Sequence, residues 1–221
     1  MSNKKQAVTI KIVSPRLPKT LAESTPNTLV FEDEALIQGL STTGADLSST
    51  KAEKMYVRES VFKHVDFREA YLHRLDLVDA RFENCDFSNC NFSDGVMHRV
   101  AFINCKLVGV NWSGVNFVDV TFESCSGTYG NFSHARFRQC AFSTCHFQHA
   151  DLQDCEFKMV LLDAVDLRQC AFAGTRLFGI DLSTCQIEGL SIRPDELRGC
   201  TVSPEQTVLL AGLFGLVVKL D

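Results

Sequence analysis

The chain has 221 residues, of which 45% are apolar and 22% are charged, with a formal net charge of −5. This balance excludes an intrinsically disordered chain and makes non-specific binding to nucleic acid unfavourable. Because the chain is mildly acidic, we expect no nucleic acid as a partner. The longest apolar stretch, residues 208–218, is too short to span a bilayer, so we expect no membrane as a partner either. The 17 Phe residues, against 3 Tyr and 1 Trp, indicate a deep, dry core.

Residues 1–44 are predicted to form an N-terminal extension and cap. Two lysines near the start are not followed by an apolar run, so we expect no secretion signal and a cytoplasmic protein. Val8, Ile10 and Ile12 alternate with polar residues, as in a short strand. Residues 31–40 could form a short helix or turn over the repeats that follow.

Residues 45–202 repeat with a period of five. Every fifth residue from Phe62 to Leu197, apart from Gly127, is large and apolar. Two residues before these centres lies a series of smaller residues, which includes all 10 cysteines: Cys85, Cys90, Cys105, Cys125, Cys140, Cys145, Cys155, Cys170, Cys185 and Cys200. Because all of them share one phase, we expect buried, reduced thiols.

A period of five fits neither an α-helix, with 3.6 residues per turn, nor a flat strand, with a period of two. It fits a chain that turns a corner every five residues, so that four sides form a square coil and the coils stack like parallel strands. We predict an all-β solenoid of about eight such coils. Phe62, Phe82 and Phe102 would then lie in one column.

Gly127 is the single centre without a side chain. Two interpretations are open. Tyr129 or another neighbour fills the space, or Gly127, Tyr129 and Gly130 mark a kink that fits the rod to a partner.

Residues 203–221 are predicted to form a helix followed by a strand at 216–220. Ser203 as N-cap, Pro204 in the first turn and Gln206 as the capping-box partner mark the start of the helix. The helix is apolar all round, so one side can cover the last coil, and a second copy of the chain is the simplest cover for the other. The expected dimer interface consists of Val208, Leu209, Leu210, Leu213, Phe214, Leu216, Val217 and Val218.

The sequence contains no catalytic constellation. A core filled with Phe leaves no pocket for a substrate, so we expect neither enzymatic activity nor a cofactor. His134, His146 and His149 could hold a metal, but they fall on outward positions without a fixed acid beside them. The cysteines lack the two-residue gap of zinc knuckles, so no metal is expected there either.

The motif Ala/Cys-Asp/Asn-Leu/Phe-x-x, as in residues 85–87, 90–92 and 150–152, resembles that of the pentapeptide-repeat family. The resemblance extends over the whole repeat region. It implies a right-handed quadrilateral β-helix, here with an N-terminal cap and a C-terminal helix.

The tail, residues 202–218, resembles that of the Qnr- and MfpA-like topoisomerase-protection proteins. The uninterrupted coil and the long N-terminal extension resemble those of their Gram-positive branch, which lacks loops in the repeats. This resemblance implies a homodimer that binds DNA gyrase and topoisomerase IV, imitates DNA and reduces quinolone action. Outward acids aligned in columns are the candidate partner contacts: Asp66, Asp86, Asp76, Asp79 and Asp166. The alternative is a structural or protein-interaction rod with an unknown partner.

Overall fold

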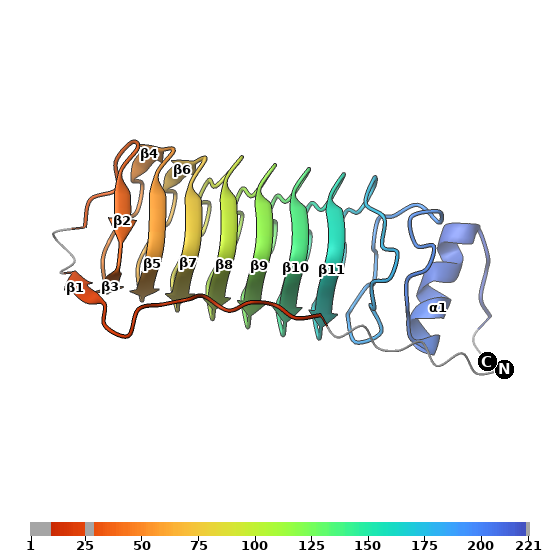
Figure 1. Ribbon diagram of the computed structural model, residues 1–221. Helices are drawn as coiled ribbons and strands as arrows, with labels where there is room; N and C mark the ends of the chain where they lie inside the picture. Colours follow the sequence, from red (N-terminus) through yellow and green to blue (C-terminus); the bar gives the residue numbers. More distant parts are fainter. Residues whose placement is uncertain (1–9, 25–28, 220–221) are drawn as a thin grey trace.

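The chain forms a rod of stacked parallel strands with a helix at one end (Figure 1). The computed structural model describes residues 10–24 and 29–219. The strands are β1 (Ala22–Ser24), β2 (Leu36–Gln38), β3 (Leu40–Thr43), β4 (Lys51–Glu53), β5 (Tyr56–Lys63), β6 (Tyr71–His73), β7 (Asp76–Glu83), β8 (Val96–Ile103), β9 (Asn116–Glu123), β10 (Arg136–Ser143) and β11 (Glu156–Asp163). The chain continues into α1 (Pro204–Ala211) and the 3-10 helix η1 (Gly212–Phe214). The predicted all-β solenoid is confirmed as a parallel β-helix of about 7 turns.

Successive coils stack in a constant register. The long strands β5 and β7 to β11 pair in parallel, so that Phe62 lies beside Phe82 and Phe82 beside Phe102. Each long strand contains two apolar centres and therefore supplies two sides of a coil. The other two sides are joined by isolated parallel bridges, such as that between Asn91 and Asn111, and by the short parallel ladder of β4 and β6.

A residue with a left-handed backbone makes the corner at the end of most sides. It lies two positions after the apolar centre: His64, Glu69, Arg74 and Asp79 have φ angles of 52°, 59°, 59° and 57°. Residues other than Gly, Asn and Asp rarely adopt this conformation, so the stacked fold imposes it on His, Glu and Arg. Gly109 occupies an equivalent corner with φ 65°. One such corner in every five residues produces the period seen in the sequence.

The Asp or Asn that directly precedes many of the apolar centres stabilises the turn on its side of the coil. Its side chain accepts a hydrogen bond from the backbone amide two residues later. The Asp66 carboxylate accepts a hydrogen bond from the Arg68 amide at 2.9 Å, and the Asn111 side chain accepts one from the Ser113 amide at 3.1 Å. The same turn occurs at Asp46, Asp86, Asn91, Asn131, Asp151, Asp166 and Asp181. An Asx side chain can replace a backbone acceptor in this way, so these residues are part of the fold.

Aromatic rings and thiols fill the interior in columns. The rings of successive coils stack with centroid distances between 4.7 and 5.1 Å in the column Phe62, Phe82, Phe102, Phe122 and Phe142. The thiol of Cys85 donates to the Phe62 carbonyl oxygen at 3.5 Å, and that of Cys105 donates to the Phe82 carbonyl oxygen at 3.6 Å. Cysteine suits these positions because it is small, apolar and a weak hydrogen-bond donor.

The sequence pattern placed the start of the coil at residue 45, but the coil begins before that residue. β2 and β3 already pair with β5, with Ile37 beside Val57 and Thr42 beside Phe62. The helix or turn predicted over residues 31–40 is therefore wrong at β2, which is a strand. Thr42 is buried at a core centre. Because Thr is polar, the pattern of large apolar residues does not include this centre.

Phe31 forms the N-terminal cap of the core. Its ring packs edge-on against Phe62 with a centroid distance of 6.3 Å and lies 5.8 Å from Phe67. Of the predicted N-terminal alternation, Val8 lies outside the described residues. Ile10 and Ile12 belong to an irregular segment instead of a strand.

Phe147 occupies the space of the missing side chain at Gly127. A Cβ atom on Gly127 would lie 2.2 Å from Cε1 of the Phe147 ring, which comes from the next coil. Tyr129 is 64% exposed and stacks on His149 with a centroid distance of 4.8 Å. The Gly127 amide donates to the next coil at 2.7 Å, so the backbone ladder continues through it. The alternative interpretation, a kink at Gly127, Tyr129 and Gly130, thus has no break in the ladder to support it.

Helix α1 starts with the predicted capping box. The Ser203 hydroxyl accepts from the Gln206 amide at 3.2 Å, and the Gln206 side chain accepts from the Ser203 amide at 2.8 Å. The buried Gln206 amide group also donates to the carbonyl oxygens of Leu182 and Cys185, each at 2.7 Å. These bonds tie the helix to the last coils. Residues 216–219 form no strand, so the predicted strand is wrong for this segment, which pairs with no sheet edge.

The thiols provide a test of the core. Cys200 alone among the 10 is only partly buried. Burial raises the pKa of Cys140, Cys155 and Cys170 to about 12, and that of Cys200 to about 11. A thiol reagent should label the native protein fastest at one group, which Cys200→Ser removes, and should label all ten after denaturation without reductant. Fewer than ten groups in the denatured protein would reveal disulfides and contradict the prediction.

Candidate protein-interaction surfaces

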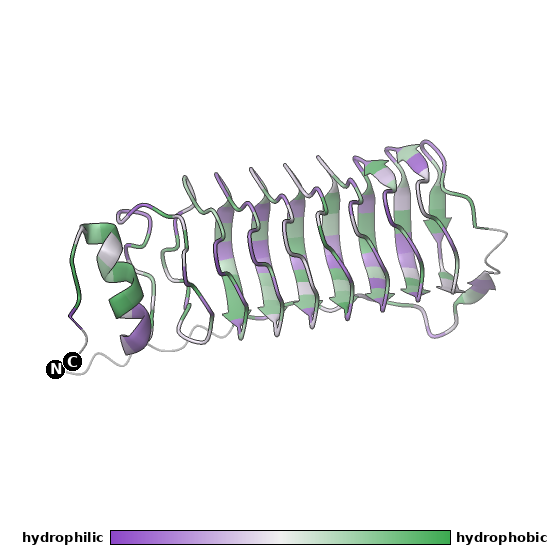
Figure 2. Ribbon diagram, turned by 180° about the vertical axis from the view of Figure 1, so that it is seen from behind, coloured by the Kyte–Doolittle hydropathy of each residue, from purple (hydrophilic) through white to green (hydrophobic). Residues whose placement is uncertain are grey.

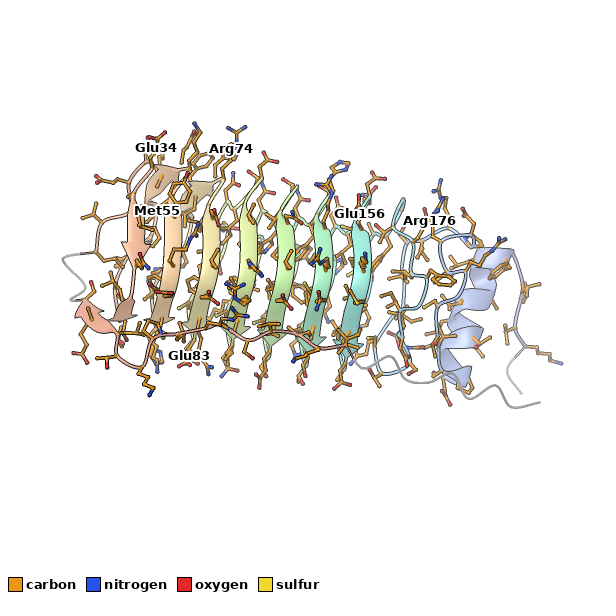
Figure 3. The ribbon with its side chains drawn as sticks, in the orientation of Figure 1. Glu34, Met55, Arg74, Glu83, Glu156 and Arg176 are labelled. Carbon is orange, nitrogen blue, oxygen red and sulfur yellow. The ribbon has the colours of Figure 1, made fainter. Side chains whose placement is uncertain are left out.

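Charged side chains of both signs project along the rod, as Glu34, Arg74 and Glu156 illustrate (Figure 3). All five acids predicted as partner contacts have a cation of the same chain beside them. The partners of Asp66, Asp86, Asp76, Asp79 and Asp166 are Arg68, Lys106, Arg58, Arg99 and Arg168, in that order. The rod therefore presents these acids as ion pairs.

Asp66 and Asp86 lie in one column and remain partly exposed. The guanidinium of Arg68 donates to Asp66 Oδ2 at 2.9 Å, and this hydrogen bond lowers the pKa of Asp66. Lys106 Nζ lies 3.4 Å from Asp86 Oδ2. Surface pairs of this kind contribute little to stability, so a partner's cation could replace the Lys106 ammonium at small cost.

Asp79 and Asp166 are buried, contrary to the prediction that they point outward as partner contacts. Their exposed fractions are 6% and 3%. Both carboxylates are covered by neighbouring chain and side chains, which removes them from the surface available to a partner. Asp76 remains half-buried, with Arg58 Nη2 at 2.8 Å from its Oδ2.

Asp166 is held by three side-chain hydrogen bonds. Arg168 donates to its two oxygens at 2.9 and 2.6 Å, and Gln148 donates to Oδ2 at 2.6 Å. Burial acts to raise the pKa of Asp166, but these bonds and that of the Arg168 amide outweigh it and hold the pKa below the usual value. The carboxylate is therefore a structural anion.

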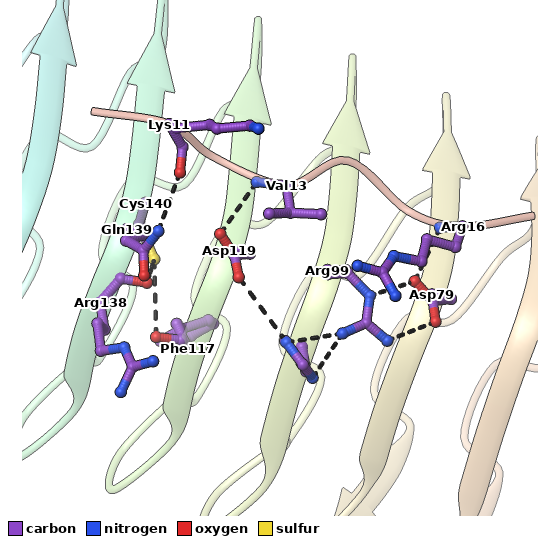
Figure 4. A network of polar contacts seen from close by, with 11 residues as sticks. Lys11, Val13, Arg16, Asp79, Arg99, Phe117, Asp119, Arg138, Gln139 and Cys140 are labelled. Carbon is purple, nitrogen blue, oxygen red and sulfur yellow. Dashed lines mark hydrogen bonds and ion pairs between the residues drawn. The ribbon is translucent and has the colours of Figure 1, made fainter. Parts of the chain in front are cut away.

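The N-terminal arm (residues 10–18) lies across the long strands, along one corner of the rod (Figures 1 and 4). Its first contact is at β10, where the Gln139 side chain donates to the Lys11 carbonyl oxygen at 2.9 Å. At β9 the Val13 amide donates to Asp119 Oδ1 at 2.9 Å. This contact joins residues 106 positions apart in the sequence.

At β7 the Arg16 amide of the arm donates to Asp79 Oδ1 at 2.8 Å. Arg99, one coil further along, donates to both oxygens of Asp79 at 2.6 Å. Burial acts to raise the pKa of Asp79, but the bonds from Arg99 and the Arg16 amide outweigh it and lower that pKa. We call Asp79, Arg99, Asp119 and Gln139 the corner column, since all four occupy left-handed corners with φ between 54° and 57°.

From the sequence, Asp79 alone in the corner column was given a role, as a partner contact, and the arm was placed in the N-terminal extension and cap. The sequence does contain one sign of the column. At the same position of three successive coils, the charge is negative, positive and negative, at Asp79, Arg99 and Asp119. The pattern becomes meaningful only once the coil length is known, because it places these residues on successive coils.

The C-terminal end carries an exposed apolar patch on and after α1, which Figure 2 shows as largely hydrophobic. Of the predicted dimer residues, Leu210 and Leu213 pack partly against the core. Exposed members form the C-terminal patch: Val208, Leu209, Phe214, Leu216, Val217 and Val218. Val217 is 98% exposed. Beside the patch lies an apolar groove lined by Leu197, Val202, Leu210 and Phe214, among others.

Residues 10–24 and 29–219 contain neither a cluster of metal ligands nor a membrane-spanning helix. Within these ranges, no three His, Cys, Asp or Glu residues gather as metal ligands would. His146 lies 4.0 Å from the buried Asp166, while His149 stacks on Tyr129. Across the same ranges, no helix has the length and apolar character needed to cross a bilayer.

The buried anion at Asp166 predicts acid sensitivity. Its pKa is lowered in the folded chain, so its contribution to stability is fully present above the unfolded value of about 3.9 and is lost as pH falls through the folded value. Asp166→Asn should therefore reduce the loss of unfolding free energy in urea titrations between about pH 5 and pH 2. Arg168→Gln should reduce it similarly, because it removes the main hydrogen-bond donor. Equal pH dependence in wild type and Asp166→Asn would contradict this prediction.

Comparison with known proteins agrees with this geometry. Residues 58–94 match the family model for pentapeptide repeats (8 copies), and residues 95–167 match the model for a pentapeptide repeat region. The uncharacterized protein YisX of Bacillus subtilis (strain 168) is 42% identical over 213 residues, which cover 95% of this chain and 98% of YisX.

Two solved structures were also found to be similar to this chain. HetL, a pentapeptide repeat protein involved in heterocyst differentiation regulation in the cyanobacterium Nostoc sp. strain PCC 7120, is 13% identical with a TM-score of 0.62, covering 77% of this chain and 86% of HetL. QnrB1, a plasmid-mediated fluoroquinolone resistance protein, is 16% identical with a TM-score of only 0.36, covering 90% of this chain and 100% of that structure. The repeat matches and the similarity to YisX over nearly the whole chain show that this protein belongs to the pentapeptide-repeat family.

Proposed function

We propose that the protein is a non-enzymatic, dimeric rod that binds type IIA topoisomerase, DNA gyrase or topoisomerase IV, in the cytoplasm and protects it from quinolones. The C-terminal patch carries this proposal, because an exposed apolar surface of this kind is typical of an interface. The tail that forms it resembles the dimerising tail of topoisomerase-protection rods. The solid core supports a role through surfaces instead of a substrate pocket.

The C-terminal patch and the adjacent groove are suited to two-fold pairing. In such an interface the same surface serves both copies, so projecting side chains of one fit a recess of the other. Val217 is almost fully exposed and can project into a partner copy. Leu197 and Val202 line the recess beside α1, together with the exposed Phe214 and Leu216. Two rods joined in this way would form one longer rod with the helices at its centre.

The dimer is tested by introducing charge into the C-terminal patch. Leu209→Asp or Phe214→Asp should give monomers by analytical ultracentrifugation at micromolar concentration, because a buried unpaired carboxylate opposes association. The matched control is Tyr129→Asp, which replaces an exposed aromatic residue on the side of the rod and should leave the dimer intact. A wild-type chain that sediments as a monomer would rule the dimer out.

Topoisomerase binding through Asp66 and Asp86 would require exchange of ion partners. These carboxylates already pair with Arg68 and Lys106, so basic residues that normally hold DNA phosphates would have to compete with them. Both cations are mostly exposed, which makes this exchange inexpensive. Binding of this type should weaken as salt is added.

The chain itself provides a substitution that removes charge but keeps the turn. Asn91 and Asn111 accept the same turn hydrogen bond as Asp66 and Asp86, so the double variant Asp66→Asn, Asp86→Asn should fold normally. It should protect DNA gyrase less than wild type in a supercoiling assay with ciprofloxacin. The difference should shrink as salt rises from about 50 to 300 mM, because screening weakens charge pairs.

Asp151→Asn is the control for this experiment, since it removes a carboxylate with the same turn role from another side of the rod. Undiminished protection by the double variant would reject acidic imitation of DNA. Absence of protection by the wild-type dimer would favour the second candidate function, a rod for another protein partner. The ion pairing of all five acids is the observation that favours this second candidate.

A further inference from the structure

The corner column binds the N-terminal arm chiefly through its backbone. The amides of Val13 and Arg16 reach the carboxylates of Asp119 and Asp79, which lie two coils apart. Two coils span about 10 Å, and three extended residues span the same distance, so an extended chain matches the spacing of the carboxylates. This recognition requires an extended polypeptide and depends little on most of its side chains.

The rod prepares this surface without help from the arm. Arg99 fixes both oxygens of Asp79, and its Nη1 also lies 2.8 Å from the His98 ring. His98 Nε2 lies 3.8 Å from Asp119 Oδ2, so the second carboxylate has a neighbour from the rod as well. The left-handed corner fixes the direction from which each side chain leaves the backbone. A preformed site of this kind loses little freedom on binding.

The arm is held by few contacts compared with the coils. It forms no strand, and its apolar residues Ile12, Val13 and Pro15 remain half-buried. Lys11, Ser14 and Arg16 are exposed. The positive charge of Arg16 adds attraction to Asp79, so the surface favours an extended segment with a basic residue at this point.

We propose that the corner column is a binding site for an extended, basic polypeptide segment of a partner protein, and that the N-terminal arm occupies this site until such a segment displaces it. This goes beyond the proposed function and is independent of it, because the bridges of Asp66 and Asp86 belong to other sides of the coil. Asp79 and Asp119 are 6% and 7% exposed under the arm, so a partner reaches their carboxylates only after the arm leaves.

The first experiment measures whether the column holds the arm. Hydrogen exchange of the Val13 and Arg16 amides in the full-length protein should be at least about tenfold faster in Asp79→Asn, Asp119→Asn, because each amide loses a charged acceptor. Asn suits these corners, since Asn84 and Asn89 adopt φ 55° and 58°.

Asp94→Asn is the matched control, because Asp94 occupies a corner with φ 58° and pairs with His73 away from the arm. It should leave both exchange rates unchanged. Equal exchange in wild type and in the double Asn variant would overturn the proposal, since the carboxylates would then not hold the arm.

The second experiment releases the arm and offers its sequence in trans. Val13→Pro, Arg16→Pro removes both donating amides of the full-length chain and leaves the rod unaltered. A fluorescent peptide with the sequence of residues 10–18 should bind this variant at least about tenfold more tightly than wild type in an anisotropy titration. Ser14→Pro, which keeps both donating amides, is the control and should resemble wild type.

Adding Asp79→Asn and Asp119→Asn to the arm-released variant should weaken peptide binding by at least about tenfold. Circular dichroism and thermal unfolding establish that each variant keeps the rod. The proposal would be overturned if the peptide did not bind the arm-released variant or bound it no more tightly than it binds wild type. It would also be overturned if the two Asn substitutions left peptide binding unchanged. None of these measurements involves a topoisomerase, so failure here is distinct from failure of the proposed function.

Discussion

The left-handed residue that makes most of the corners is the constraint on which the rest of the structure depends. It ends a side after five residues, and four sides return the chain to the same position one coil higher. The energy of this backbone state is unfavourable by roughly 1–2 kcal/mol for residues such as Met159 and Arg99, so the stacked coils must impose it. Parallel hydrogen bonds and stacked rings do so, because a residue in another backbone state would break the register on both neighbouring coils.

Because of this constraint, residues at the same position of successive coils stack in columns. A side chain has as neighbours the residues one coil before and one coil after it, so the environment of each position is set by residues far away in sequence. Phe147 fills the space at Gly127 for this reason, and Arg99 fixes Asp79 for the same reason. Inside, the columns carry rings and thiols. Outside, they carry ion pairs and Asx turns.

The sequence allowed the coil, its period, the buried cysteines and the capping box to be predicted, because each depends on a local pattern. It misplaced the start of the coil, since Thr42 at a core centre is polar. It also misjudged the acids: phase alone makes Asp79 and Asp166 outward, but their burial results from the arm and from Gln148 and Arg168. The contact with the arm depends on a segment that no periodic pattern places, and the contacts of Gln148 and Arg168 depend on side-chain directions that phase alone does not give.

Because the core of the rod is solid, a partner can bind only to its sides, corners or ends. Turn hydrogen bonds engage most of the Asp and Asn residues that precede the centres, and same-chain cations pair with all five candidate acids, so a free row of negative charge does not arise from the repeat. The two surfaces that involve residues outside the repeat are therefore the most informative: the apolar C-terminal patch, and the corner column, whose repeat residues bind the N-terminal arm. The repeat holds these two surfaces at a fixed separation. Selection for a partner can act on these terminal segments without disturbing the register that the coils require.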